Sequence, residues 1–332
     1  MPVNPIQPIT ARPREISVAE PVSPALERVK LMLFQPFDLG KWFVIGFCAW
    51  LAYLGEAGSG FSGGNFNPGN HSHGNGTDFH HGLEQAWGYV LNNLYWIVPV
   101  AAFVIFLCLA LGLLFLWLNC RGKFMFLHCV ALNKAEVVEP WNKFEREGNS
   151  LFWFRLVLVL IGAVLTLPLL VTIAVLILRM VLHGEPDVSG IVTAAGLALV
   201  FLALAIVFAV IKKFTVDFVV PIMFLRRRKC WAAWKEFYGL LSAHPGQFAL
   251  YILFQIVLAM AIGVIVLGAI IITCCIAGCL MALPYLGTVL LLPVLIFKRA
   301  YPLYYLAQYG PQYDVFPPPP VPPMAGTSPL PV

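Results

Sequence analysis

Charged side chains are scarce in this sequence of 332 residues: only 11% are Asp, Glu, Lys or Arg, whereas 60% are hydrophobic. A soluble domain has about 25% charged residues. So few polar groups cannot cover the surface of a water-soluble globule, and the composition therefore indicates an integral membrane protein. The formal net charge of +5 is small, so the positions of the cations matter more than their sum.

The sequence also lacks the motifs that identify common enzymes. It contains no H-E-x-x-H and no phosphate-binding P-loop, and no pair of carboxylates lies within an apolar stretch. Its 8 cysteines include no C-x-x-C pair. We therefore expect a protein that is not an enzyme and that carries no cofactor.

The two ends of the chain lack long apolar runs. The first thirty residues have no continuous apolar core of the kind found in a signal peptide, and they are interrupted by prolines. The C-terminal sequence "FPPPPVPPMAGTSPLPV" is too rich in proline to form helices or sheets. We predict a disordered arm at 1–22 and a disordered Pro-rich tail at 311–332, on either side of a membrane domain at 23–310.

Long apolar runs between these ends predict an all-α, polytopic membrane bundle. A spanning helix needs about 20 apolar residues. The weakest candidate is "WFVIGFCAWLAYLG" at 42–55, which reaches a spanning length only with its flanks. The run 248–297 is too long for one crossing and must fold back. The six predicted spans are 39–58, 94–118, 156–178, 190–211, 248–272 and 277–297.

Lysine and arginine near a span mark the cytoplasmic side of a membrane. The segments before, between and after the predicted spans, with Lys41 counted in the first, carry 5, 0, 6, 1, 7, 0 and 2 of them, so twenty of the 21 lie in alternate segments. If 42–55 did not cross, this alternation would fail at its first step. The sequence therefore predicts six crossings of the cell membrane, with both termini in the cytoplasm.

The cytoplasmic segments share a pattern that predicts an internal repeat. "WNKF" at 141–144 and "WKEF" at 234–237 each follow a basic pair and an apolar stretch, and each precedes a helix breaker and a returning span. We expect each unit to be an amphipathic elbow helix at the membrane interface followed by a helical hairpin. A chance match of two short motifs is the alternative.

The segments "AWKEFYGLLSAHPGQFALY" and "PWNKFEREGNSLFWFRL" carry a resemblance to known families. Their plan resembles that of uncharacterised prokaryotic multi-pass membrane proteins of unknown function. It is also similar in organisation to the membrane domain of glycerophosphoryl diester phosphodiesterases. The resemblance covers roughly 23–310 and implies a helical membrane fold. It implies no reaction, because this chain has no catalytic phosphodiesterase domain.

Cations beside aromatic residues give the main candidate site. Trp prefers the headgroup level of a membrane, and cations there attract anionic lipid headgroups. We expect the bilayer and its anionic lipid headgroups as partners, together with a membrane protein partner or a second copy of this chain, and no nucleic acid. The predicted interface-binding residues are Arg226, Arg227, Arg228, Lys229, Trp231, Trp234 and Trp141.

Two further groups are candidates for chemistry. The extracytoplasmic Gly/Asn/His-rich loop at 57–86 has histidines that can bind zinc, copper or nickel, although a glycine-rich loop does not hold ligands in place. These candidate metal ligands are His71, His73, His80 and His81. Lys213 and Asp217 lie four residues apart, where they can form an ion pair on one helical face or serve transport.

These features favour a non-enzymatic membrane scaffold or lipid-interacting protein. The alternative is a transporter or permease for a small or apolar substrate, because prolines interrupt several predicted spans. Almost no charge lies within the predicted spans to handle an ion or a polar substrate, which favours the first interpretation.

Overall fold

A computed structural model describes residues 16–55, 92–183, 188–273, 278, 281 and 283–316 of the chain. Within these residues the protein is helical and contains no strand. The α-helices are α1 (Val22–Leu33), α2 (Leu39–Tyr53), α4 (Leu94–Leu132), α5 (Val138–Lys143), α6 (Glu145–His183), α7 (Val188–Phe214), α8 (Val220–Arg226), α9 (Cys230–Ala243), α10 (Pro245–Ile272), α12 (Pro284–Leu290) and α13 (Leu292–Ala307). A π-helix, η1 (Thr215–Val219), joins α7 to α8, and a 3-10 turn, η2 (Pro311–Tyr313), follows α13.

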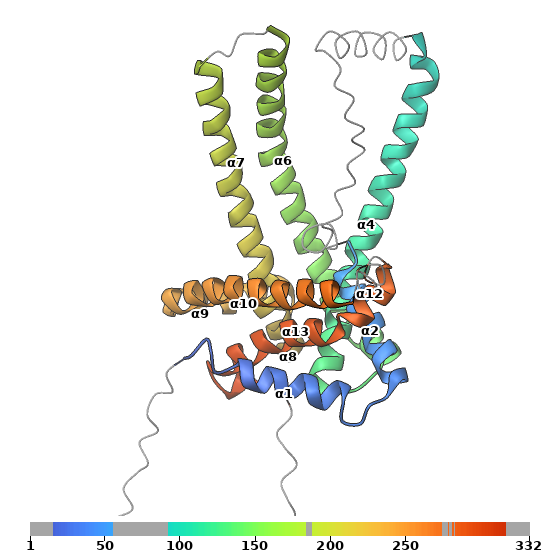
Figure 1. The fold of residues 1–332 in the computed structure, drawn as a ribbon, viewed down its shortest axis with the longest axis vertical. Coiled ribbons are helices and arrows are strands. Elements are labelled where there is room, and N and C mark those ends of the chain that lie inside the picture. Colours follow the sequence, from blue (N-terminus) through green and yellow to red (C-terminus); the bar gives the residue numbers. More distant parts are fainter. Residues whose placement is uncertain are drawn as a thin grey trace, which may run out of the picture.

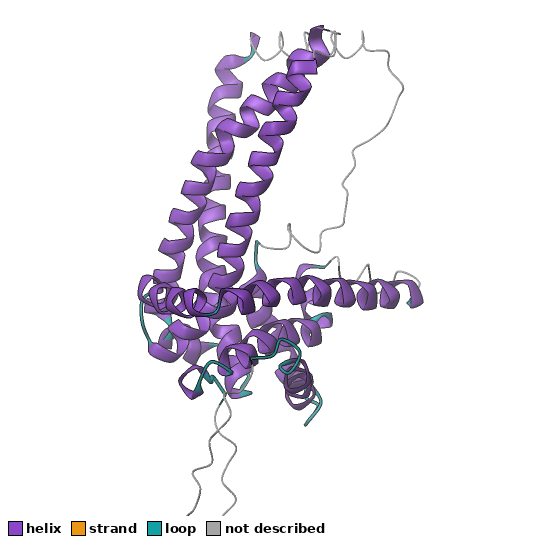
Figure 2. Cartoon of the chain, turned by 90° about the vertical axis from the view of Figure 1, so that its left-hand side faces the viewer, coloured by secondary structure: helices purple, strands orange, loops and turns teal. Residues whose placement is uncertain are grey.

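The helices α4, α6 and α7 stand upright above a base formed by the other helices and the lower end of α4 (Figure 1). α6 packs against both α4 and α7, α2 packs along the lower part of α4, and α1 packs on α13. Figure 2 shows the same division from the side, with the upright helices above and the base below.

The upright parts expose apolar side chains on all sides. None of the residues in the most apolar stretches of α4, α6 and α7 is buried within the protein. Exposure of that much apolar surface to water would be strongly unfavourable, at about 25 cal/mol for each Å². Among the described residues, four helices are long and apolar enough to cross a membrane, namely these three and α10.

Aromatic rings hold the base together. The ring of Phe218 in η1 lies 5.2 Å from Phe237 of α9, 5.3 Å from Phe248 and 4.9 Å from Tyr251, both of α10. All four side chains are fully buried. Aromatic pairs at such distances add about 0.5–1.5 kcal/mol each to the burial of their area. The cluster therefore fixes the first turns of α10 to the base.

The remainder of α10 departs from the upright arrangement that the sequence predicts. It lies transverse to α4, α6 and α7, passing across their lower ends in Figure 1 and projecting to one side of them in Figure 2. The sixth predicted span, 277–297, is divided in the structure, because α12 ends at Leu290 and α13 begins at Leu292 with a proline next to it. Proline lacks the amide that would continue the preceding helix. The first predicted span corresponds to α2, which has 15 residues.

The packed unit extends beyond the predicted limits of 23–310 at both ends. The Ser17 amide donates to Oε1 of Gln308 (2.8 Å), and the ring of Phe316 stacks on Tyr304 with centroids 4.2 Å apart. Residues 16–22 and 311–316 are therefore part of the base, although the sequence predicts disorder there. The rest of the predicted arm and tail, and the loop 57–86, lie outside the described residues.

The W-x-x-F units differ from each other in the structure. "WKEF" lies in α9, which ends at a break before α10, as predicted. "WNKF" spans the end of α5, and α6 then continues without interruption through Gly148, where the sequence predicts a break. A helix tolerates a single glycine at a cost of about 1 kcal/mol when its neighbours pack well. Here Gly148 lies against the side chain of Arg121.

Candidate functional site

A groove of about 660 Å³ opens between α4, α6 and α7, beside the end of α2. This volume lies within the range of about 300–1,000 Å³ that small-molecule sites occupy. The walls are almost entirely apolar. The lining includes Gly112, Asn119, Arg155, Gly162, Thr166 and Lys212.

Three polar side chains close the lower end of the groove. Asn119 of α4 donates from Nδ2 to the carbonyl oxygens of Ala52 (2.7 Å) and Leu54 (2.9 Å). These carbonyls belong to the end of α2, where backbone acceptors have no partner within the helix. The Oδ1 atom of Asn119 accepts from Nη1 of Arg155 at 2.5 Å. Asn119 thus orients a buried guanidinium at the foot of the groove.

Lys212 of α7 adds a second cation to the same lining. The hydroxyl of Thr166, higher in the groove, donates to its own helix at the Gly162 carbonyl (2.8 Å). The groove therefore has positive charge at one end and apolar walls above it. From Arg155 to Leu170, both in the lining, α6 rises about 22 Å at 1.5 Å per residue. This arrangement suits an elongated amphiphile with an anionic end.

These polar residues were not among the sites predicted from the sequence, although a signal for them exists. Asn119, Arg155 and Lys212 each lie one residue beyond the end of a predicted span, at ends that the sequence predicts to face the cytoplasm. Helices that cross the membrane together bring such flanking residues to one level. The sequence could therefore place them at one depth, but it could not show that they line one groove.

The predicted interface cluster is gathered only in part. Arg227, Arg228 and Lys229 line a second cavity of about 320 Å³, together with Arg146 and Glu147 of α6. Arg227 ends α8 in the left-handed conformation, with φ of 53°, and its Nε lies 3.4 Å from Oε1 of Glu147. A cluster of four cations around one acid attracts phosphate or carboxylate groups.

The other members of the predicted cluster lie elsewhere. Arg226 pairs with Glu236 of α9, with Nη2 and Oε1 3.3 Å apart. Trp231 is exposed, whereas Trp234 is partly buried against Phe154 and Phe237.

Trp141 contacts a cation within the base. The guanidinium of Arg121 lies 4.8 Å from the ring of Trp141 and 4.5 Å from that of Trp117. Its Nη2 atom is 2.8 Å from Oε1 of Glu145. Such cation–π contacts contribute about 2 kcal/mol or more when desolvated. Trp141 therefore holds α4, α5 and α6 together in the base.

The Lys213–Asp217 ion pair predicted from the sequence is present, with Nζ and Oδ2 2.8 Å apart. The hydroxyl of Tyr251 also donates to Oδ2 of Asp217 (2.8 Å), which links η1 to α10. This carboxylate is buried, so its partners offset a large desolvation cost.

The π-helix beside this pair has a local cause. The amide of Val220 donates to Thr215, five residues earlier, and in that register the partner of the Val216 carbonyl would be Pro221, which has no N–H. Nη1 of Arg299 donates to that carbonyl instead, at 2.7 Å. The buried arginine of α13 thereby stabilises the irregular turn that carries Asp217.

The predicted metal-binding histidines, His71, His73, His80 and His81, lie outside the described residues.

The upright apolar helices and their packed base define an integral membrane protein that is helical throughout the described residues. The chain belongs to a family of unknown function, DUF7544, whose model matches residues 16–291. No curated protein and no solved structure matches the chain.

Proposed function

We propose that this protein is a non-enzymatic, lipid-interacting membrane protein that binds an anionic amphiphile between α4, α6 and α7. The observation that carries the proposal is the apolar groove with Arg155 and Lys212 at its foot. The hydrocarbon part of the ligand lies along the apolar walls, and its anionic end lies beside the two cations. A free fatty acid and an anionic phospholipid share this chemistry.

The groove favours a lipid over a polar transport substrate. Its polar groups are gathered at one end, whereas transporters bind polar substrates near the middle of the membrane. The hydroxyl of Thr166, the polar side chain higher in the lining, is already bonded to its own helix. A transporter or permease for an apolar substrate remains the alternative prediction, and uptake by proteoliposomes tests it.

Filling the groove tests the proposal. A Cβ atom at Gly112 meets no other atom within 4 Å, so Gly112→Phe can be accommodated and places a ring in the groove. Gly196 of α7 is equally unobstructed and is not part of the lining, so Gly196→Phe is a matched control. We expect Gly112→Phe to lose most of the anionic lipid detected by native mass spectrometry of protein in nanodiscs. Equal lipid retention in the two variants would contradict the proposal.

Neutralising Lys212 tests the anionic end of the ligand. One cation near a membrane surface contributes about 1 kcal/mol, so Lys212→Gln should weaken the preference for anionic over zwitterionic lipid about fivefold. Nanodiscs containing either a fatty acid or an anionic phospholipid identify the source of the anion. Replacing Arg226, Arg227 and Arg228 by glutamine should leave the occupancy of the groove unchanged. An equal effect of the two changes would assign the preference to general surface charge.

The finer topology is also a proposal. Six crossings of the cell membrane with both termini in the cytoplasm are supported by the alternation of the cations. They require α10 to swing upright from its transverse position. Single cysteines at positions 75 and 190, in a cysteine-free chain, should be labelled from outside intact cells, and one at 228 should not. Labelling at 228 would overturn this orientation.

The prokaryotic origin, which follows from the resemblance to uncharacterised prokaryotic membrane proteins, and the similarity in organisation to the membrane domain of glycerophosphoryl diester phosphodiesterases both remain predictions. The elbow units and their repeat are predictions too. A contact that the units share supports the repeat. Phe144 stacks on Phe124 and Phe237 stacks on Phe218, in each case with the ring planes 11° apart.

A further inference from the structure

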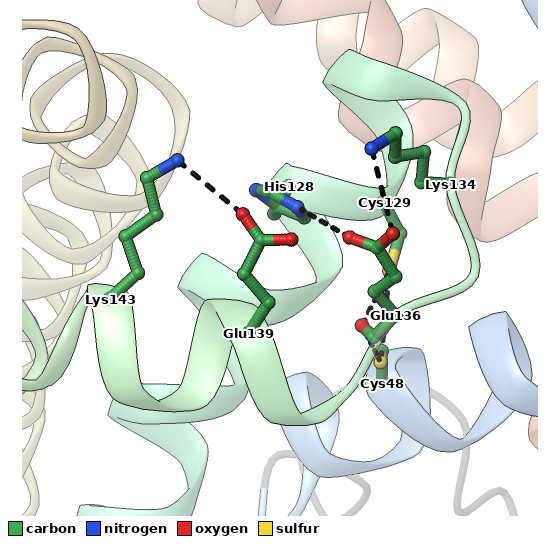
Figure 3. A network of polar contacts seen from close by, with 7 residues as sticks. All are labelled: Cys48, His128, Cys129, Lys134, Glu136, Glu139 and Lys143. Carbon is green, nitrogen blue, oxygen red and sulfur yellow. Dashed lines mark hydrogen bonds and ion pairs between the residues drawn. The ribbon is translucent and has the colours of Figure 1, made fainter.

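A second polar cluster lies at the lower end of α4, where the chain turns into α5 (Figure 3). It is formed by His128 of α4, Glu136 of the connecting segment and Glu139 of α5. One nitrogen or oxygen ligand atom from each residue lies within 4.8 Å of the others. No role was predicted from the sequence for any of these three residues, and none of them lines the groove.

Two members of the cluster carry buried atoms without hydrogen-bond partners. His128 is only 1% exposed, and neither of its ring nitrogens has a partner. Oε2 of Glu136 is also buried and without a hydrogen bond. Its distance of 3.6 Å from Nε2 of His128 is too long for one. A buried polar atom left without a partner costs about 1–3 kcal/mol. A bound group that contacts these atoms would remove that cost.

The local backbone brings these side chains together. Asn133 follows α4 in the left-handed conformation, with φ of 58°, and reverses the chain. The carbonyl oxygen of Glu136 then lies 3.6 Å from Sγ of Cys129, which anchors the connecting segment to α4. Glu139 follows in the first turn of α5. In Figure 3 the three side chains approach one another from these three segments.

Two lysines form ion pairs with the carboxylates of Glu136 and Glu139. Nζ of Lys134 is 3.5 Å from Glu136, and Nζ of Lys143 is 3.7 Å from Glu139. Their side chains are 58% and 49% exposed, so both can turn into water when a cation approaches. Exposed ion pairs of this kind contribute only about 0–1 kcal/mol, and a divalent cation can displace them.

We propose that His128, Glu136 and Glu139 form a zinc-binding site. Imidazole and carboxylate are both zinc ligands, at about 2.0–2.2 Å. Ligands at those distances in a tetrahedron lie about 3.4 Å apart, so closure needs a shift of roughly an ångström from the present separations. The exposed Glu139 side chain can supply that shift. The fourth position is left to water. Zinc here ties the end of α4 to the start of α5.

The experiment measures zinc binding to the full chain in nanodiscs. His71, His73, His80 and His81 are first replaced by alanine, so that loop histidines do not contribute. Glu139→Gln removes one ligand at an exposed position, and Glu27→Gln, an exposed site on α1, is the matched control. Titration calorimetry with Zn²⁺ gives the affinity, and melting curves with and without Zn²⁺ give the stabilisation, which follows mass action.

We expect Glu139→Gln to weaken zinc binding at least about tenfold, because even the loss of a residue that only supports a ligand costs that much. The rise in melting temperature on adding Zn²⁺ should shrink in Glu139→Gln and persist in Glu27→Gln. Glu136→Gln should repeat the loss, and His128→Gln should repeat it if that variant folds. Equal affinity and equal stabilisation in Glu139→Gln and Glu27→Gln would overturn the proposal, as would equally tight binding of Ca²⁺, which does not use imidazole.

Discussion

The two halves of α4 share one helix but have opposite surroundings. Residues 98–115 are all exposed, whereas residues 119–131 are all buried in the base. The exposed half is apolar throughout, and the buried half contains Arg121, Lys123 and His128. This inverts the pattern of a soluble helix, in which charges are exposed and apolar residues are buried. Lipid therefore solvates the upper half, and protein solvates the lower half.

The comparison shows that different forces hold the two parts. In lipid there is no hydrophobic drive between helices, because the surrounding tails are as apolar as leucine. In the base the buried charges have specific partners, such as Glu145 for Arg121, and rings from several helices interlock. Stability should therefore depend on side chains of the base and only weakly on those of the upright helices.

The largest contrast is expected for phenylalanine. Phe218→Ala should lower the free energy of unfolding by about 3–5 kcal/mol, because it leaves a cavity at the centre of the aromatic cluster. Phe106 of α4 is 69% exposed, so Phe106→Ala leaves no cavity and should change stability by about 0.5 kcal/mol or less. SDS-driven unfolding in mixed micelles measures both. Similar losses would show that the upright helices pack more tightly than the exposure of Phe106 indicates.

A pair of glycines ten residues apart on α4 gives the next contrast. A Cβ atom at Gly122 would lie 2.5 Å from the backbone of Leu51, so Gly122→Ala should push α2 away from α4 and cost about 1–3 kcal/mol. Gly112→Ala meets nothing within 4 Å and should be neutral or stabilising. The same unfolding assay compares the two. Tolerance of alanine at position 122 would contradict the close α2–α4 contact.

Hydrogen bonds give a third contrast between the base and the upright helices. Asp217→Asn loses the charge that Lys213 and Tyr251 share, and should cost about 2 kcal/mol. Thr166→Val, in the upright part, removes only a bond within one helix and should cost about 0.5 kcal/mol or less. If Asp217→Asn abolished a transport activity without lowering stability, the proposed structural role of the Lys213–Asp217 pair would be contradicted.

The smallest effect concerns a single thiol of the base. Burial raises the pKa of Cys230 to about 12, whereas a thiol in the unfolded chain has a pKa of about 8.5. The folded state therefore keeps its proton above pH 8.5, and this group's contribution to stability falls as the pH rises from there. In a chain with Cys230 alone, maleimide at pH 9 should react slowly until the protein is unfolded. Rapid labelling of the folded protein would show that the base opens.

Several features of this fold follow from the sequence alone. The apolar runs predict the upright helices, and the spacing of Lys213 and Asp217 predicts the ion pair that the structure confirms. The transverse course of α10 could not be predicted, because its composition suits a spanning helix equally well. The cluster of His128, Glu136 and Glu139 depends on the chain reversal at Asn133, which spacing along the chain does not indicate.

The composition alone indicates that this protein belongs in a membrane, because a chain so apolar must be solvated by lipid wherever it does not pack on itself. The sequence also predicts that Asn119, Arg155 and Lys212 lie at one depth in the membrane, because each flanks the end of an apolar run. Which of these groups come into contact is seen only in the folded protein. Contacts between distant segments depend on helix packing and chain reversals, and those follow from the fit of whole surfaces.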